Sequence, residues 1–169
     1  ANIYWMSLGW KLKALGAERT RHTYEEPQPE LLERFPSPSG DPETNPAGVA
    51  LALRIDVPEF SCLCPITAQP DWARIVIRYQ PDRWCVESKS LKLYLGSFRN
   101  AGVFHEGVDT RICKELVAML EPEWLVVEGR FTPRGGIPFR QPPPGAAPWW
   151  EGPQPLEARD VDPVAHRRI

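Results

Sequence analysis

A thiol and a carboxylate that could act together lie within residues 61–71, which read SCLCPITAQPD. Two cysteines two positions apart, followed by an aspartate, could form half of a metal site, a disulfide, or a nucleophile with a proton donor beside it. Zinc sites are typically built from CxxC pairs, or from one CxxC pair with a matching pair of histidines. The spacing here is CxC, and His22, His105 and His166 are far apart in sequence. The pattern therefore disfavours a structural zinc site, and no metal site is predicted.

The same stretch leaves the role of the second thiol open. In an extended chain, the Cα atoms of Cys62 and Cys64 would lie about 6.6 Å apart, near the upper limit for a disulfide, so a bridge between them is disfavoured. A cysteine attacks as a thiolate, which needs a lowered pKa or a nearby base. Cys64 precedes Pro65, where a regular strand should end, and Asp71 is close enough to reach the same cleft. The residues alone fit both a buried inert thiol and a catalytic nucleophile.

Three cations lie in segments that could bind phosphate. Lys89 and Lys92 in VESKSLKLY (86–94) are three positions apart and share one face if this segment is helical. Ammonium groups suit phosphate as point charges, although a solvated helix face is the other interpretation. Arg134 lies in TPRGG, where a guanidinium and the backbone amides of a glycine-rich turn can also hold phosphate. An ordinary hairpin turn explains that segment equally well.

The segment VFHEGVD (103–109) places His105 and Glu106 at the start of a predicted helix. One interpretation is that the glutamate lies there because the positive end of the helix dipole stabilises it. The other is that its carboxylate accepts two parallel N–H bonds from a planar ligand, such as one edge of a guanine-type ring. No G-x-G-x-x-G motif follows a strand, so a Rossmann dinucleotide site is not predicted.

The composition limits the class of protein. The 169 residues suffice for one ordinary core. Lys and Arg number 20 against 22 Asp and Glu, which gives a net charge of −2 and argues against direct nucleic-acid binding, because that needs a clustered basic surface. No apolar run approaches the ~20 residues that cross a membrane. With four cysteines and no signal-peptide pattern, a cytoplasmic location is expected.

Periodicity predicts the elements that position these residues. Strands are predicted over residues 48–57, 73–79, 124–131 and 137–141, from β-compatible residues and alternating polarity. Helices are predicted over 89–100 and 105–120, and Pro122 ends the second one. This order predicts an α+β fold, an antiparallel sheet with both helices on one face. Association of several copies would cover the exposed edges of such a single layer.

Two proline-rich segments bound this regular middle. We therefore expect an N-terminal arm (1–46), a catalytic domain (47–140) and a Pro/Trp-rich tail (141–169).

Four segments occur together in an order and spacing that resemble a known family. SCLCPITAQPD, VESKSLKLYLGSFRN, FHEGV and GRFTPRGGI are similar to segments of the short, single-module QueF-type nitrile reductases. These enzymes reduce 7-cyano-7-deazaguanine in the biosynthesis of queuosine, a tRNA modification. The resemblance covers roughly residues 12–140. It implies a tunnelling fold with the element order ββααββ, which assembles into multi-subunit barrels with active sites between subunits.

The resemblance also implies a role for each candidate residue. Cys64 matches the nucleophile that adds to the nitrile carbon and forms a covalent thioimide, and Asp71 matches the general acid that protonates nitrogen. Glu106, with His105, matches the residues that hold the deazaguanine ring. Cys62 matches no functional position and is expected to be a packing residue.

Further residues match binding positions of the family. The implied substrate contacts are Val86, Glu87 and Ser88. The implied ligands of the NADPH phosphates are Lys89, Lys92 and Arg134. Two NADPH molecules would take the nitrile through an imine to a primary amine.

Three other functions compete with this interpretation. An amidinotransferase-like relative would use the same cysteine and aspartate to add ammonia without reduction, but such proteins differ at ESKSLK. A zinc cyclohydrolase of the same fold would need cysteine and histidine ligands at spacings that this sequence lacks. A noncatalytic assembly module is disfavoured only by the resemblance.

Overall fold

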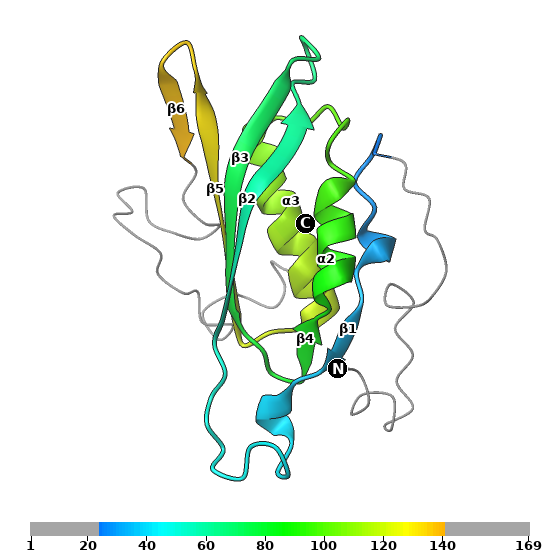
Figure 1. The fold of residues 1–169 in the computed structure, drawn as a ribbon, viewed down its shortest axis with the longest axis vertical. Helices are drawn as coiled ribbons and strands as arrows, with labels where there is room; N and C mark the ends of the chain where they lie inside the picture. Colours follow the sequence, from blue (N-terminus) through cyan, green and yellow to red (C-terminus); the bar gives the residue numbers. More distant parts are fainter. Residues whose placement is uncertain (1–23, 141–169) are drawn as a thin grey trace.

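The computed structural model describes residues 24–140, which form an antiparallel four-stranded sheet with two helices on one face (Figure 1). The strands are β2 (Leu53–Leu63), β3 (Pro70–Gln80), β5 (Trp124–Arg134) and β6 (Ile137–Arg140), in the order β2-β3-β5-β6. The helices are α2 (Ser88–Gly96) and α3 (His105–Leu120). The predicted α+β class is confirmed. The predicted tail, 141–169, and residues 1–23 of the predicted arm lie outside the described residues.

A small second sheet was not predicted from the sequence. It pairs β1 (Arg34–Pro36) with β4 (Trp84–Val86), and the 3-10 helices η1 (Pro29–Leu31) and η2 (Pro38–Gly40) flank β1. The amide of Glu33 donates to the Ser90 hydroxyl at 3.0 Å and so fixes this segment against α2. A strand of three residues is too short to show an alternating pattern in the sequence. Its partner strand is also distant in sequence, so no hairpin pattern links the two.

The first long strand begins later than predicted. Residues 48–57 were expected to be extended, but β2 starts at Leu53 and continues to Leu63. The reason is a turn, in which the side chain of Asn45 accepts from the amide of Val49 at 2.9 Å and Gly48 takes a positive φ of 62°. Glycine adopts this conformation without the steric cost that other residues bear.

An irregularity in β2 decides which of its residues enter the core. Between Val57 and Phe60 the pairing with β3 shifts its register. Leu53, Ile55 and Val57 are partly buried before the shift, and Phe60 and Cys62 are fully buried after it. The shift therefore moves the buried positions from odd to even residue numbers, as an extra residue in one strand requires.

The second helix has the predicted bounds, residues 105–120. Its stripe of Val108, Ile112, Leu116 and Leu120 is completely buried, and the helix packs against β5. The first helix ends at Gly96 rather than at residue 100, because the chain turns at Ser97, whose hydroxyl donates to the carbonyl of Tyr94 at 2.5 Å. None of the helices described within residues 24–140 is long and apolar enough to cross a membrane.

Candidate functional site

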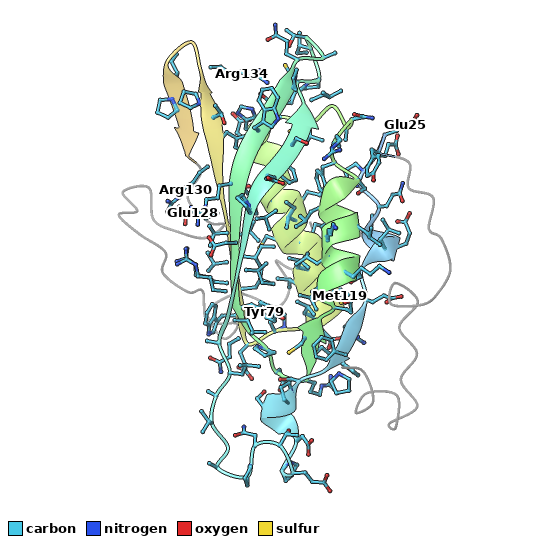
Figure 2. The ribbon with its side chains drawn as sticks, in the orientation of Figure 1. Glu25, Tyr79, Met119, Glu128, Arg130 and Arg134 are labelled. Atoms are coloured by element: carbon cyan, nitrogen blue, oxygen red, sulfur yellow. The ribbon has the colours of Figure 1, made fainter. Side chains whose placement is uncertain are left out.

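A cavity of about 320 Å³ lies at one end of the sheet, where the ends of four strands meet the start of α3. We call it the Cys64 pocket. Its lining residues with reactive or charged side chains are Cys64, Asp71, His105, Glu106 and Arg134; the others are Pro65, Val103, Phe104 and Ile137. Figure 2 shows Arg134 at the upper end of the sheet, next to β3. The structure therefore brings together five of the predicted site residues from three separate sequence segments.

The end of β2 is joined to the segment that leads into α3. The amide of Leu63 donates to the carbonyl of Ala101 at 2.9 Å, and the amide of Val103 donates to the carbonyl of Leu63 at 3.0 Å. A Cβ on Gly102 would lie 3.2 Å from the Cα of Pro65, so glycine allows the two segments to approach this closely. This pairing is what places His105 beside Cys64.

The loop after β2 surrounds the sulfur of Cys64 with hydrogen-bond donors. The amide of Cys64 donates to the carbonyl of Gln69, and the amide of Ala68 donates back to the carbonyl of Cys64, both at 2.9 Å. The pKa of Cys64 is lowered to about 6, because the Thr67 hydroxyl and amide, the Arg134 guanidinium and the Ile66 amide all hydrogen bond to its sulfur. At neutral pH this thiol is therefore largely a thiolate, the form that attacks electrophiles.

The neighbouring cysteine has the opposite character. Cys62 is 0 % exposed, and burial raises the pKa of its thiol to about 12. Burial also raises the pKa of Cys85 and takes that of Cys113 to about 11. All four thiols are free. The prediction that Cys62 packs in the core is confirmed.

Asp71 is held by two partners inside the pocket. Its side chain is 4 % exposed. The Nε of Arg134 donates to Oδ1 at 2.5 Å and the Nη2 of Arg134 forms an ion-pair contact with Oδ2, so both carboxylate oxygens lie against the guanidinium. The Nε2 of His105 lies 3.0 Å from Oδ2, and the His105 ring stacks on Phe131 with a centroid distance of 4.0 Å. The stacking holds the imidazole in place, with its Nε2 beside the carboxylate.

Glu106 lies at the rim of the pocket and is exposed. Within residues 24–140 its carboxylate has no hydrogen bond or ion pair, although its backbone carbonyl accepts from Thr110 in α3. Two large apolar side chains beside it, Phe104 and Ile137, are 60 % and 67 % exposed. The rim thus offers a carboxylate acceptor next to apolar surface, which suits a flat ring with donors on one edge.

The segment around the start of α2 lies away from the Cys64 pocket. Ser88 and Lys92 line a second cavity of about 400 Å³ between β2 and α2. The carboxylate of Glu87 caps α2, accepting from the amides of Lys89 at 2.9 Å and Ser90 at 2.6 Å. Val86 is buried, and its amide donates to the hydroxyl of Tyr79. One chain therefore does not bring these predicted binding residues to Cys64.

Sequence reasoning missed two residues that shape the pocket. Thr67 was not singled out, yet its hydroxyl is the largest influence on the pKa of Cys64. Phe131, which orients His105, reads in sequence as an ordinary core residue of a strand. The only sequence signal for the role of Thr67 was weak: it is a hydroxyl residue in a short loop between two predicted strands. Over the described part of the chain, no group of three His, Cys, Asp or Glu side chains could hold a metal ion.

Comparison with known proteins gives consistent results. A family model described as QueF-like protein matches residues 70–141. The chain is 47 % identical over 132 residues to an NADPH-dependent 7-cyano-7-deazaguanine reductase of Methylorubrum extorquens, covering 78 % of this chain and 77 % of that protein. Proteins of the same name from Methylocella silvestris and Ruegeria pomeroyi are 57 % identical over 108 residues and 54 % over 113, covering 60 % and 67 % of this chain and 71 % and 68 % of theirs.

A solved structure is similar in fold. The apo form of the archaeosine synthase QueF-Like superposes with a TM-score of 0.52 at 18 % identity, covering 57 % of this chain and 96 % of that one. Similarity at this level concerns the fold alone.

Proposed function

We propose that this chain, which belongs to the QueF family of NADPH-dependent 7-cyano-7-deazaguanine reductases, reduces the nitrile of 7-cyano-7-deazaguanine to a primary amine at the Cys64 pocket. The observation that carries the proposal is the thiol of Cys64, whose pKa is lowered to about 6, in one cavity with the buried carboxylate of Asp71. The family takes part in queuosine biosynthesis, and the free cysteines fit a reducing cytoplasm.

The first step is addition of the Cys64 thiolate to the nitrile carbon. A C–S bond forms, one π bond of the nitrile breaks, and the nitrogen takes a proton to give a covalent thioimide. Asp71 is the proposed source of that proton, since it lines the same cavity. His105 contacts the same carboxylate and holds it in place from the other side. The covalent bond keeps the substrate in the pocket until the thiolate leaves again.

Recognition of the ring is assigned to the rim of the pocket. The Glu106 carboxylate is the proposed acceptor for the N–H donors on one edge of deazaguanine, with His105 beside it. Analogues that lack these donors would be rejected, because they would leave the carboxylate without its partners. Val86, Glu87 and Ser88 are the proposed contacts from a second chain.

The cations of the chain fit the phosphates of NADPH, which supplies the two hydrides when it is bound. Arg134 lies in the Cys64 pocket at the β5–β6 hairpin, whereas Lys92 lines the cavity between β2 and α2. In Figure 1 that hairpin lies at the β6 edge of the sheet, whereas α2 lies in the helix layer next to β2. A dinucleotide that contacts Arg134 together with Lys89 and Lys92 would therefore span two chains.

This arrangement supports the proposed assembly into barrels of several copies with sites between subunits. Within residues 24–140, β2 has a strand on one side only, and β6 pairs with β5 only from Arg130 onward. The outer edge of β2 and the first half of β5 are thus open to strands from other copies, as a closed barrel needs.

The test is to mix the protein with NADPH and 7-cyano-7-deazaguanine and to follow the loss of nicotinamide absorbance. We expect two NADPH to be consumed per primary amine formed. Cys64→Ala should abolish turnover, and Cys62→Ala is the matched control that should retain it. If the substrate binds without oxidation of NADPH, the reductase proposal fails; an amidine product formed from ammonia would identify the amidinotransferase reaction instead.

A further inference from the structure

The guanidinium of Arg134 contacts both reactive groups of the pocket at once. It forms the ion pair with Asp71 described above, and it also hydrogen bonds to the sulfur of Cys64. Nε and Nη2 both face the carboxylate, so this edge of the guanidinium is already occupied. A phosphate that needs the same edge must compete with Asp71 for it.

The position of Arg134 allows it to change partners. Its side chain is 42 % exposed, while that of Asp71 is 4 % exposed. It is the last residue of β5, and Gly135 and Gly136 follow with φ angles of 57° and 81°. A Cβ added to either glycine would meet nothing within 4 Å, so the turn is open on this side. The backbone amides of such a turn and a guanidinium at its base can together bind a phosphate.

We propose that Arg134 is a positioning residue that couples cofactor binding to the charge of the Cys64–Asp71 pair. Before the dinucleotide binds, the guanidinium holds the thiolate and the carboxylate together; when the dinucleotide binds, its phosphates draw the guanidinium away to the Gly135–Gly136 turn. This inference rests on the proposed function, because it takes NADPH as the dinucleotide.

The movement of Arg134 from the Cys64–Asp71 pair to the phosphates would suit the two stages of the reaction, because addition and reduction need different charges in the pocket. Addition to the nitrile needs a thiolate, which the guanidinium stabilises; Asp71 passes one solvent proton to the nitrogen in this step and is left ionised, paired with Arg134. Each reduction then adds a hydride to carbon, which oxidises one NADPH to NADP⁺, and needs a proton on nitrogen. Once the guanidinium has left, the carboxylate of Asp71 can take a proton from solvent and give it to the nitrogen, which becomes an N–H while Asp71 returns to its ionised form. A dianionic phosphate competes well for arginine, since it carries more charge than a carboxylate.

The test measures how the rate of Cys64 alkylation by iodoacetamide depends on pH, with intact mass as the readout. In the wild-type protein the rate should be half-maximal near pH 6. In Arg134→Met the midpoint should rise by about one pH unit, which slows alkylation about tenfold at low pH. Arg130→Met is the matched control: Arg130 lies on the same strand, pairs with Glu128 away from the pocket (Figure 2), and should leave the midpoint unchanged.

The decisive arm adds NADP⁺, which has no hydride to give. It should raise the midpoint of the wild-type protein by an amount similar to the Arg134→Met change, and it should have much less effect in Arg134→Met itself. The midpoint, and not the rate, is compared, because a bound nucleotide also blocks access to the thiol. If NADP⁺ binds but the midpoint does not move, or moves equally in Arg134→Met, the coupling is refuted. Neither outcome depends on turnover, so failure of the reductase assay would be recognised separately.

Discussion

A buried carboxyl group should make the stability of this fold depend on pH. Asp109 of α3 is completely buried against β5, and its Oδ2 accepts from the amide of Gly129 at 2.7 Å. Its Oδ1 has no hydrogen-bond partner among the described residues. Burial, with a smaller contribution from the charge of Glu128, raises the pKa of Asp109 to about 7, although the Gly129 amide opposes the shift. The native state thus favours the protonated acid.

The sign and size of the effect follow from the two pKa values. In the unfolded chain Asp109 loses its proton near its ordinary value of 3.8, whereas in the folded chain it keeps the proton up to about pH 7. Between these values the native state binds more protons, so the free energy of unfolding falls as pH rises. A difference of about three pH units at 1.36 kcal/mol each gives a loss of roughly 4 kcal/mol.

Asp109→Asn should remove this loss, because asparagine cannot ionise and keeps an oxygen that accepts from Gly129. The free energy of unfolding in urea should be measured for variant and wild type at several values between about pH 4 and about pH 8, at one protein concentration. The variant should gain stability relative to wild type as pH rises. Asp82→Asn, at an exposed aspartate, is the control and should show no trend. A variant-minus-wild-type difference that stays constant with pH would refute the assigned pKa.

Three further changes test other parts of the structure. The covalent adduct with 7-cyano-7-deazaguanine, seen by intact mass, should disappear in Cys64→Ala and persist in Cys62→Ala; an adduct that survives the first change would mean that another residue is the nucleophile. Gly129→Ala should destabilise the fold by about 3 kcal/mol, because its Cβ would lie 2.2 Å from Asp109 Oδ1, and thermal unfolding should show a much smaller cost in an Asp109→Ala background. Thr67→Val should move the alkylation midpoint of Cys64 above pH 6, since the hydroxyl is the main cause of the lowered pKa; an unchanged pH–rate profile would contradict that assignment.

Local signals predicted the parts of the fold that depend on local sequence. The stripe from Val108 to Leu120 repeats at helical spacing and Pro122 follows it, so α3 and its end could be predicted from the sequence. The predicted start of β2, at residue 48, was wrong. The turn around Asn45 and Gly48 depends on a side-chain hydrogen bond, which apolar composition does not reveal. The β1–β4 sheet was missed because each of its strands has three residues, too few to show an alternation of polar and apolar side chains.

The candidate site divides in the same way. Cys64 and Asp71 flank one hairpin loop, so their proximity could be read from the sequence. The approach of His105 could not, because it depends on the backbone pairing of Leu63 with the segment before α3. The pairing of Arg134 with Asp71 could not be predicted either. A glycine-rich turn suggests a phosphate site, and nothing in the sequence indicates that a carboxylate on the neighbouring strand β3 would contact the arginine. Family resemblance named these residues, and the backbone pairing explains how they meet.

The different chemistry of the two neighbouring cysteines follows from where β2 shifts register and where it ends. Residues two apart on a strand face the same side, so a regular strand would give Cys62 and Cys64 the same surroundings. The shift between Val57 and Phe60 turns Cys62 into the core, where burial raises the pKa of its thiol to about 12. The strand then stops at Leu63, because Pro65 cannot donate to a continuing ladder. Cys64 therefore leaves the sheet at the point where loop amides and a hydroxyl can reach its sulfur, and strand geometry, not residue type, makes one thiol inert and the other reactive.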